Sequence, residues 1–322
     1  MKQQSTELVS VIMCTYNEQE EWLRKSIESI LNQTWKNIEL IIVIDNPDSK
    51  MLKKVVAEYA EKDARIKVIQ NEKNIGIARS SNKAWKTSKG CFVAKMDADD
   101  ISRVDRIEHE IEFAYKKTLD LVFSNRINIS EKGDELLETR ALPSDEKIYK
   151  ILPYGDIIVN SSVLISRKIL EETGGYRDLP SAEDYDLWLR ILTSKNGYKI
   201  GGLDEKLIYY RIRENSISRE NIYKQYLYTN YVRKLYNKRK RGNTNDNFSQ
   251  SNLKNYINKN YNDKKNIKFI KGSEYFEKSV EYVKKGERFL GISFFLKAFF
   301  SSFDFAKQIY FTLICEVIRR WK

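Results

Sequence analysis

Apolar side chains in the first hundred residues fall into two alternating patterns. Short apolar, mostly β-branched runs are typical of buried strands and lie at Val9–Cys14, Ile38–Ile44, Ile66–Ile69 and Cys91–Met96. Between them, apolar residues recur at helical spacing, which predicts helices around 22–31, 52–59 and 77–87. This alternation predicts right-handed βαβ units and a mostly parallel sheet flanked by helices, which is an α/β fold.

Later elements are predicted by the same patterns. In chain order they are a helix over 103–115, a strand or hairpin over 119–129, a loop with a short helix over 131–156, a strand over 161–166, a short helix ending at Gly174-Gly175, a helix over 182–192 and a strand over 207–213. After about residue 215 the character changes. Tyrosines stand among Lys and Arg, an Asn/Ser-rich loop is predicted at 242–252, and three amphipathic helices are predicted at 273–288, 290–300 and 303–320. We therefore predict a catalytic domain over 1–217 and a basic, helical region over 218–322.

Polar clusters follow each of the first four strands. They are Thr15-Tyr16-Asn17, Asp45, Asn71 to Asn74, and Asp97-Ala98-Asp99-Asp100. The carboxyl ends of parallel strands share one edge of a sheet, where ligands bind in open α/β folds. Three carboxylates within four positions repel one another, so a metal ion, an Arg or Lys, or solvent should lie among them.

The composition limits the kinds of metal and catalytic site that the chain can form. His109 is the only histidine, so the sequence excludes a metal site built on several histidines. A Ser-His-Asp triad is not possible with His109 alone. The three cysteines, Cys14, Cys91 and Cys315, are far apart, and two fall in predicted buried strands. We therefore expect free thiols and a cytoplasmic protein. We expect no signal peptide, and no uncharged run of the C-terminal third reaches the roughly 18 residues of a spanning helix.

Positive charge is concentrated in one segment. The net charge is +12, and residues 215–271 hold 14 Lys/Arg against 3 Asp/Glu. Two interpretations stay open: a solvated, partly flexible connection, or attraction to an anionic surface, either membrane phospholipid or nucleic acid.

A series of short motifs runs in order along residues 8–217. They are Val9 to Ile12 with Thr15 to Glu18, Ser29 to Thr34, Glu39 to Asp45, Asn74 to Arg79 with Asn82, Asp97 to Asp100, Gly174-Gly175-Tyr176, Ala182 to Trp188, and Tyr210-Arg211 through Ser218. Each motif alone is weak, but the whole series resembles the inverting family 2 glycosyltransferases of bacterial polysaccharide biosynthesis. The resemblance implies the GT-A fold, a Rossmann-like sheet flanked by helices.

The resemblance implies a metal at the carboxylate cluster. Asp99 would ligate Mn²⁺ or Mg²⁺, with Asp97 as a further ligand or a contact to the nucleotide. Hard cations prefer carboxylate and phosphate oxygens, and a metal on the donor diphosphate would offset the charge of the leaving nucleotide. For Asp100, ligation and capping of the following helix both stay open.

The nucleotide pocket would come from the other strand ends. The resemblance assigns to it Thr15, Tyr16, Asn17, Asp45, Asn74, Gly76 and Arg79. Asp45 is retained, but the loop after it, Asn46-Pro47-Asp48, departs from the two acids and Gly-Ser of many members. Packing is the alternative for Tyr16, and a helix-face salt bridge is the alternative for Arg79.

The resemblance makes Asp184 the general base and has Glu183 bind the donor sugar or the acceptor. Both could instead be helix-start acids, and Asp186 lies on the wrong side of that helix for the same task. Members often carry a metal-ligating His where this chain has Arg213. An Arg cannot ligate a metal, but it can bind a diphosphate, so we expect weaker metal binding and a leaving-group role for Arg213.

The sequence thus predicts a glycosyltransferase of hexosyl or N-acetylhexosaminyl groups. It would transfer a sugar from a UDP-sugar to a saccharide or lipid-linked acceptor in cell-surface polysaccharide biosynthesis. Two alternatives stay open: a sugar nucleotidyltransferase of similar fold, although the Gly-rich loop typical of such enzymes is not found after the first strand, and a basic nucleic-acid-binding protein, although no nucleic-acid motif is recognised. We also expect docking on an anionic membrane surface through residues 215–322, which would place the enzyme peripherally on the inner face of the cell membrane.

Overall fold

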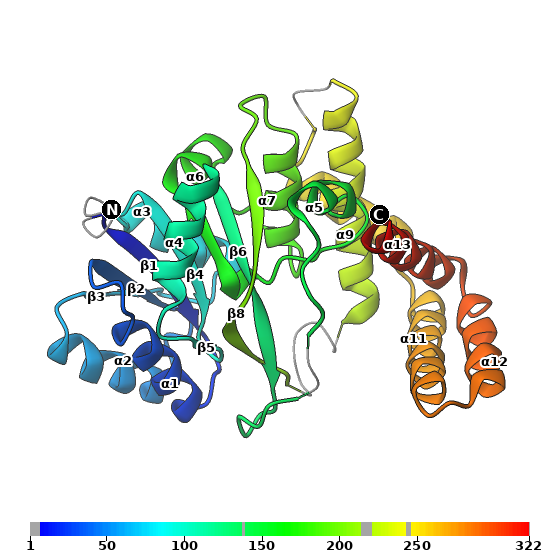
Figure 1. The fold of residues 1–322 in the computed structure, drawn as a ribbon, viewed down its shortest axis with the longest axis horizontal. Helices are drawn as coiled ribbons and strands as arrows, with labels where there is room; N and C mark the ends of the chain where they lie inside the picture. The colour runs from blue at the N-terminus through cyan, green and yellow to red at the C-terminus, as the bar shows by residue number, and fades with distance from the viewer. Residues whose placement is uncertain (1–6, 137–138, 214–220, 243–245, 322) are drawn as a thin grey trace. The chain divides into compact units, whose positions relative to one another are not determined.

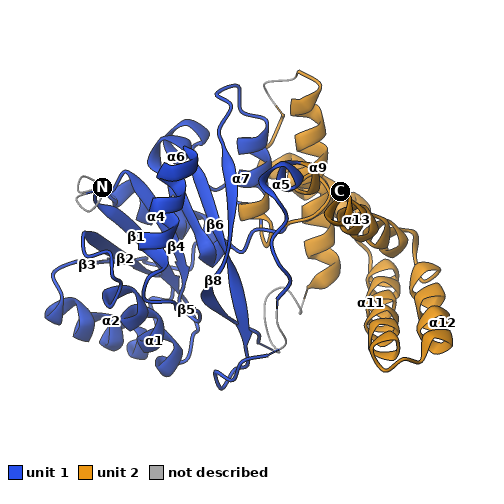
Figure 2. Ribbon diagram, viewed as in Figure 1, with its two compact units in different colours: residues 1–149, 157–179, 186–214 blue, residues 150–156, 180–185, 215–322 orange. Residues whose placement is uncertain are grey.

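The chain forms two compact units in the computed structural model, which describes residues 7–136, 139–213, 221–242 and 246–321. The first unit comprises residues 1–149, 157–179 and 186–214, and the second comprises 150–156, 180–185 and 215–322 (Figure 2). The expected domain boundary at 217/218 and the final Ser216-Ile217-Ser218 motif lie outside the described residues.

The first unit is built on an eight-stranded sheet with strand order β3-β2-β1-β4-β7-β6-β8-β5 (Figure 1). The strands are β1 (Val9–Thr15), β2 (Ile38–Ile44), β3 (Ile66–Gln70), β4 (Phe92–Asp97), β5 (Ile101–Ser102), β6 (Leu121–Ile129), β7 (Val163–Ser166) and β8 (Ile200–Arg211). β1 to β4 pair in parallel and β6 pairs in parallel with β8, whereas the pairs β4·β7, β6·β7 and β5·β8 are antiparallel. The predicted α/β fold with a mostly parallel sheet is confirmed.

Helices cover both faces of this sheet. They are α1 (Glu20–Leu31), α2 (Lys50–Lys62), α3 (Ile77–Thr87), α4 (Arg106–Lys117), α5 (Asp145–Ile151), α6 (Arg167–Thr173) and α7 (Glu183–Leu192). On one face, Val11 and Met13 of β1 belong to a core that α1, α2 and α4 complete. On the other face, the Cys14 thiol lies 3.7 Å from the Ser81 hydroxyl of α3. Successive β1 side chains thus point to opposite faces, each covered by a helix.

Two predictions within the first unit are wrong. β8 begins at Ile200, seven residues before the predicted start, and its first part contains Gly201 and Gly202, a residue type with low strand propensity. At both glycines the strand packs closely: a Cβ on Gly201 would lie 2.3 Å from Leu119, and one on Gly202 would lie 3.0 Å from Ile148. Cys91 is exposed rather than buried, because β4 starts one residue after it.

The second unit contains five whole helices in the part of the chain that is described, besides the end of α5 and the first turn of α7. They are α9 (Ile222–Lys240), α10 (Gln250–Asn260), α11 (Asp263–Lys284), α12 (Arg288–Phe299) and α13 (Phe303–Arg320). An aromatic core joins α9, α11 and α13, with Tyr226 and Phe305 each about 5 Å from the Phe269 ring, at 4.8 and 5.1 Å between centroids. None of the described helices is long and apolar enough to cross a membrane.

The tyrosine-rich basic segment is therefore structured. Tyr223 of α9 is completely buried, so the interpretation of this stretch as a flexible connection is wrong. The predicted loop at 242–252 is partly helical, since α10 begins at Gln250, and α11 begins ten residues before the predicted helix start. Burial of its tyrosines in the tertiary core stabilises α9, whose apolar positions show little helical periodicity.

Candidate active site

The polar clusters after the first four strands meet at one edge of the sheet. The register pairs Thr15 of β1 with Ile44 of β2, and Ile44 with Gln70 of β3, while Asp97 of β4 pairs with Cys14. The residues that follow these strands consequently lie side by side. The predicted common edge is confirmed, and it follows from the parallel connection of the strands.

Asp45 organises the turn before α3. Its carboxylate accepts hydrogen bonds from the backbone N–H groups of Ile75 and Gly76, each at 2.9 Å, and from the Asn71 side chain at 2.7 Å. Gly76 has φ 83° and ψ 161°, a conformation that a residue with a Cβ rarely adopts. The structure thus brings three predicted pocket residues together, since the Asn74 side chain also accepts from the Gly76 N–H at 2.9 Å.

The loop after β1 is fixed by two residues that carried no prediction of their own. Glu18 accepts from the Thr15 hydroxyl and from the Tyr16 N–H, both at 2.7 Å. Asn46 donates to the Tyr16 carbonyl and to the Asn17 side chain, both at 3.0 Å. The unusual loop after Asp45 therefore ties the first two strand ends together, and Tyr16 stays exposed rather than packed.

Each acid of the carboxylate cluster has a partner from the protein. Lys95 donates to Asp97 at 2.7 Å, and the Arg213 guanidinium lies 2.9 Å from an Asp99 oxygen. Asp100 accepts from the Ser161 hydroxyl at 2.5 Å and from the Arg211 N–H at 2.8 Å. The need for positive charge inferred from the sequence is met by Lys95 and Arg213.

Asp100 does not cap the following helix. The N-cap of α4 is Asp105, so the capping alternative is wrong. Asp100 is buried and instead joins β8 to the residues before β7 through its contacts with Arg211 and Ser161. Burial and the neighbouring Asp99 raise the pKa of Asp100 well above its usual value.

Burial and mutual repulsion among the acids raise pKa values in the cluster. Burial raises the pKa of Asp99 to about 6, Arg213 opposes this shift, and Asp97 and Glu18 add to it. Burial and the charges of Asp100, Asp97 and Asp99 also raise the pKa of the nearby Tyr210 to about 12. An additional cation at this edge would therefore be stabilised.

Arg211, the last residue of β8, and Arg213 lie against Trp22 of α1 beside the carboxylate cluster. The guanidinium carbons of Arg211 and Arg213 lie 5.1 Å and 6.0 Å from the centroid of the Trp22 ring. Arg211 is buried and donates to the Asp99 carbonyl at 2.8 Å and to the Ser130 and Glu131 carbonyls at 3.0 Å. Trp22 and Arg211 received no site role from the sequence, although both stand in stretches already assigned to the right elements.

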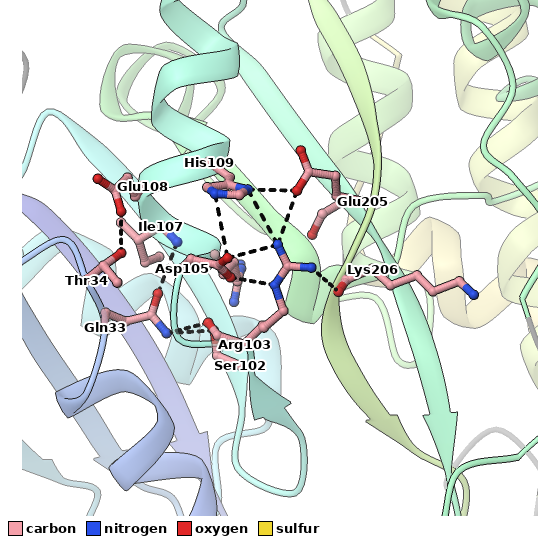
Figure 3. Close-up of polar contacts among 12 residues, drawn as sticks. Gln33, Thr34, Ser102, Arg103, Asp105, Ile107, Glu108, His109, Glu205 and Lys206 are labelled. Carbon is pink, nitrogen blue, oxygen red and sulfur yellow. Dashed lines mark hydrogen bonds and ion pairs between the residues drawn. The ribbon is translucent and has the colours of Figure 1, made fainter.

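Gln33, which follows the end of α1, holds the segment between the carboxylate cluster and α4 in place. Gln33 is buried, donates to the Arg103 carbonyl at 2.7 Å and accepts from the Ile107 N–H at 3.0 Å (Figure 3). Arg103 in turn bonds to Asp105 and lies 3.1 Å from Glu205 of β8. These contacts fix the segment between the acids and α4, and they tie it to the strand that carries Arg211 (Figure 3).

The remaining predicted residues fall outside the cluster. Arg79 of α3 forms an exposed salt bridge with Asp178 at 2.7 Å, as the alternative of a helix-face salt bridge predicted. Asn82 bonds to the backbone of Tyr176 and thereby holds the Gly174-Gly175 turn beside α3. A Cβ on Gly175 would lie 2.3 Å from an Asn82 oxygen, so this position requires glycine.

Glu183 and Asp184 stand on the first turn of α7, in the second unit. Their pairing with the carboxylate cluster of the first unit thus stays a prediction. Asp186, further along the helix, is buried and bonds to Arg190 at 2.7 Å, which donates to the Thr173 and Gly175 carbonyls. Asp186 therefore has a structural role.

The acids fit a divalent cation. In the part of the chain that is described, no group of three or more His, Cys, Asp or Glu side chains is placed to hold a metal ion. Mg²⁺, however, is usually held by one or two carboxylates together with substrate phosphates and water. Asp97 and Asp99 supply two carboxylates, and a cation would relieve the repulsion from Asp97, which adds to the effect of burial in raising the pKa of Asp99.

The matching family and the relatives found by comparison with known proteins are all named as glycosyltransferases. The family described as Glycosyl transferase family 2 matches residues 10–174. An uncharacterized glycosyltransferase of Methanocaldococcus jannaschii is 40% identical over 240 residues, which cover 73% of this chain and 81% of the relative. The O-antigen biosynthesis glycosyltransferase WbnJ of Escherichia coli is 33% identical, with 65% and 82% covered.

A third relative and a solved structure extend the comparison. The UDP-Glc:alpha-D-GlcNAc-diphosphoundecaprenol beta-1,3-glucosyltransferase WfgD of Escherichia coli is 30% identical, with 66% of this chain and 79% of the relative covered. The structure of residues 1–349 of Staphylococcus aureus TarS, in complex with UDP-GlcNAc, superposes with a TM-score of 0.54 at 17% identity and covers 89% of this chain and 90% of that one. At this identity the likeness concerns the fold.

Proposed function

The chain belongs to glycosyltransferase family 2 and is a glycosyltransferase, and from this premise we propose that it transfers a sugar from a UDP-sugar to a saccharide or lipid-linked acceptor, with inversion. One observation supports this most strongly: Asp97 and Asp99 stand at the carboxyl edge of a parallel sheet, beside the loops that follow β1 and β2. That edge is where an α/β fold binds its ligand. Relatives named for O-antigen and diphosphoundecaprenol-linked products point to cell-surface polysaccharide biosynthesis.

The nucleotide would occupy the edge formed by the first three strand ends. Thr15, Tyr16 and Asn17 would line it on one side, and the turn of Asn74 and Gly76 would line it on the other. Asp45 already accepts two hydrogen bonds from this turn and one from the Asn71 side chain, so its proposed role is mainly to position the turn. Arg79, held by Asp178, would contact a donor phosphate only after exchanging its ion pair.

Asp99 and Asp97 would hold Mn²⁺ or Mg²⁺. The metal, when bound, would offset negative charge on the diphosphate of the donor. Arg213 now pairs with Asp99, so the ion pair must open for Asp99 to take a cation. The released guanidinium would then be free to bind the diphosphate as a fork.

Asp184 would act as general base. It would take the proton of an acceptor hydroxyl while the oxygen attacks the anomeric carbon. The bond between that carbon and the diphosphate oxygen breaks on the opposite face, and UDP leaves with both bonding electrons. Glu183 would bind the donor sugar or the acceptor beside it.

A lipid-linked acceptor would bring the enzyme to a membrane surface. We propose peripheral association with the inner face of the cell membrane, supported by the basic character of the second unit. Between residues 221 and 260 there are nine Lys or Arg and one acid, Asp246.

A donor-hydrolysis screen tests the proposal. Released nucleotide is measured for a panel of nucleotide-sugars with Mn²⁺ or Mg²⁺, for the natural chain and for Asp99→Ala and Asp184→Ala. We expect UDP-sugars to be hydrolysed, and each substitution to lower the rate about 100-fold or more. Full activity in both variants would defeat this mechanism, and turnover of another nucleotide class alone would replace the UDP assignment. Asp186→Asn is unsuitable as a control because it would break a buried ion pair, whereas the exposed Glu172→Gln leaves the site untouched.

A further inference from the structure

A stripe of exposed apolar side chains runs along α12 and reaches the start of α13. We call it the α12 stripe, and it consists of Phe289, Ile292, Leu296, Phe300 and Phe303, which are 92%, 58%, 48%, 77% and 85% exposed. Within α12, spacings of three and four residues place Phe289, Ile292 and Leu296 on one face of the helix, Phe300 directly follows its last residue, and Phe303 begins α13. Scattered exposed apolar residues are normal, but a contiguous set marks an interaction surface.

The stripe is not needed for packing within the unit. The opposite face of α12 already packs on α11: the Phe294 ring stacks on Tyr282 with centroids 5.3 Å apart, and Phe295 lies 6.4 Å from Phe276. α11 and α12 run as adjacent antiparallel helices in Figure 1. The hairpin therefore has a satisfied inner face and an apolar outer one.

Basic side chains border the stripe. Lys284 and Arg288 are exposed at the turn that joins α11 to α12, next to Phe289. Lys297 is exposed beside Leu296, with its ammonium 4.7 Å from the centroid of the Phe294 ring. Such side chains keep their charge in the polar layer while their stems and the neighbouring rings contact apolar surface.

Few acids offset these cations. Between Val283 and Lys307 there are five basic residues and two acidic ones, and one of the acids, Asp304, accepts a hydrogen bond from the buried Tyr223. The border of the stripe is thus positively charged.

We propose that the α12 stripe and its basic border dock on an anionic phospholipid surface. Apolar side chains flanked by Lys and Arg are what interfacial helices use to insert below anionic headgroups. A second copy of the chain fits this surface less well, because pairing two stripes would bring their basic borders together. The inference shares the membrane setting of the proposed function, but its test does not depend on catalysis.

Vesicle flotation tests the proposal. The full chain is mixed with vesicles of phosphatidylglycerol and phosphatidylcholine, or of phosphatidylcholine alone, and the floating fraction gives a partition coefficient. We expect strong flotation only with phosphatidylglycerol. Phe289→Ser/Phe300→Ser/Phe303→Ser should lower partitioning about 100-fold. These side chains are exposed, so thermal unfolding and donor hydrolysis without vesicles should stay as in the natural chain.

Two charge variants test whether the position of the basic residues matters, rather than the net charge alone. Lys284→Glu/Arg288→Glu/Lys297→Glu should lower partitioning at least about tenfold. Lys264→Glu/Lys268→Glu/Lys271→Glu makes the same change in net charge toward the other end of α11, and we expect an effect within about threefold because salt screens over about 8 Å.

Three outcomes would overturn the docking surface. They are equal flotation of the phenylalanine variant, equal losses in the two charge variants, and unchanged flotation combined with loss of a dimer in analytical ultracentrifugation. The last outcome would identify the stripe as a contact between two copies. Failure of donor hydrolysis with intact flotation would instead count against the proposed function alone.

Discussion

Arg213 offers the sharpest test of the site, because it lies where a metal-ligating histidine is expected and pairs with the proposed ligand Asp99. Replacing it with Ala removes a positive charge 2.9 Å from the Asp99 carboxylate. Unit charges about 4 Å apart attract by about 4 kcal/mol at an effective dielectric constant of about 20. The Arg213 side chain is 28% exposed and the Asp99 side chain 12%, so solvent screening and desolvation reduce the net value to about 1–2 kcal/mol.

This free energy opposes metal binding, because a cation at Asp99 must displace Arg213. We therefore expect Arg213→Ala to tighten Mn²⁺ binding in the absence of donor about tenfold, since 1.4 kcal/mol corresponds to a factor of ten. Arg213→His, which adds an imidazole ligand, should tighten it further. Turnover should respond in the opposite direction and fall about 100-fold or more, because the leaving diphosphate loses a cation.

Two assays separate these effects. Free Mn²⁺ is measured by electron paramagnetic resonance during titration of the protein, and kcat is measured in donor hydrolysis at saturating metal. Arg213→Lys is the matched control, because it keeps the charge and should retain near-natural Mn²⁺ affinity. Unchanged Mn²⁺ affinity in Arg213→Ala would refute competition for Asp99, and unchanged kcat would refute the leaving-group role.

Three further predictions address the structure around the site. Gly175→Ala, at φ 72° with its Cβ 2.3 Å from a side-chain oxygen, should lower the free energy of unfolding in urea by about 3 kcal/mol. Gly174→Ala, at φ 73° in open space, should lower it by only about 1 kcal/mol. Equal losses in the two variants would contradict the clash at Gly175. Asp45→Asn sets an amide NH₂ against a backbone N–H, so it should lower the free energy of unfolding by about 2 kcal/mol in the same assay. It should also weaken UDP binding in calorimetry. An affinity for UDP equal to that of the natural chain would show that Asp45 is not part of the pocket. Partial desolvation of the Cys91 sulfur and its hydrogen bond to Glu7 raise the pKa of this thiol to about 11. Its alkylation rate, followed by mass spectrometry, should therefore rise about tenfold per pH unit from pH 8 to 10. Glu7→Gln should speed the reaction at pH 8, and a rate that levels off near pH 9 would show that the thiol is not so perturbed.

Much of the first unit could be predicted because its signals are local. The run Ile38–Ile44 and the helical spacing over Ile77–Thr87 match β2 and α3 residue for residue. Parallel connection then places the ends of successive strands together, so the pattern alone predicts Thr15, Asp45 and Asp97 at one edge. The predicted strand start was wrong at β8, whose first part includes Gly201, a residue type with low strand propensity that here packs closely against Leu119.

The partners of the site residues were decided only by the tertiary structure. Arg213 and Asp99 are more than a hundred residues apart, and no periodicity links them; they meet because β5 pairs with β8 and brings the end of β8 to the carboxylate cluster. The same holds for Asn46 with Tyr16 and for Gln33 with Arg103, side chains whose roles depend on neighbours from other elements.

In the second unit the sequence established amphipathic helices but not which of their faces would be covered. Phe295 and Phe300 stand in the same apolar run, yet Phe295 packs against α11 and Phe300 is exposed. A hydrophobic pattern fixes which positions of a helix share a face, because helical geometry is local. Whether that face is buried in a core or left for a partner depends on the neighbouring helix, which only the folded chain supplies.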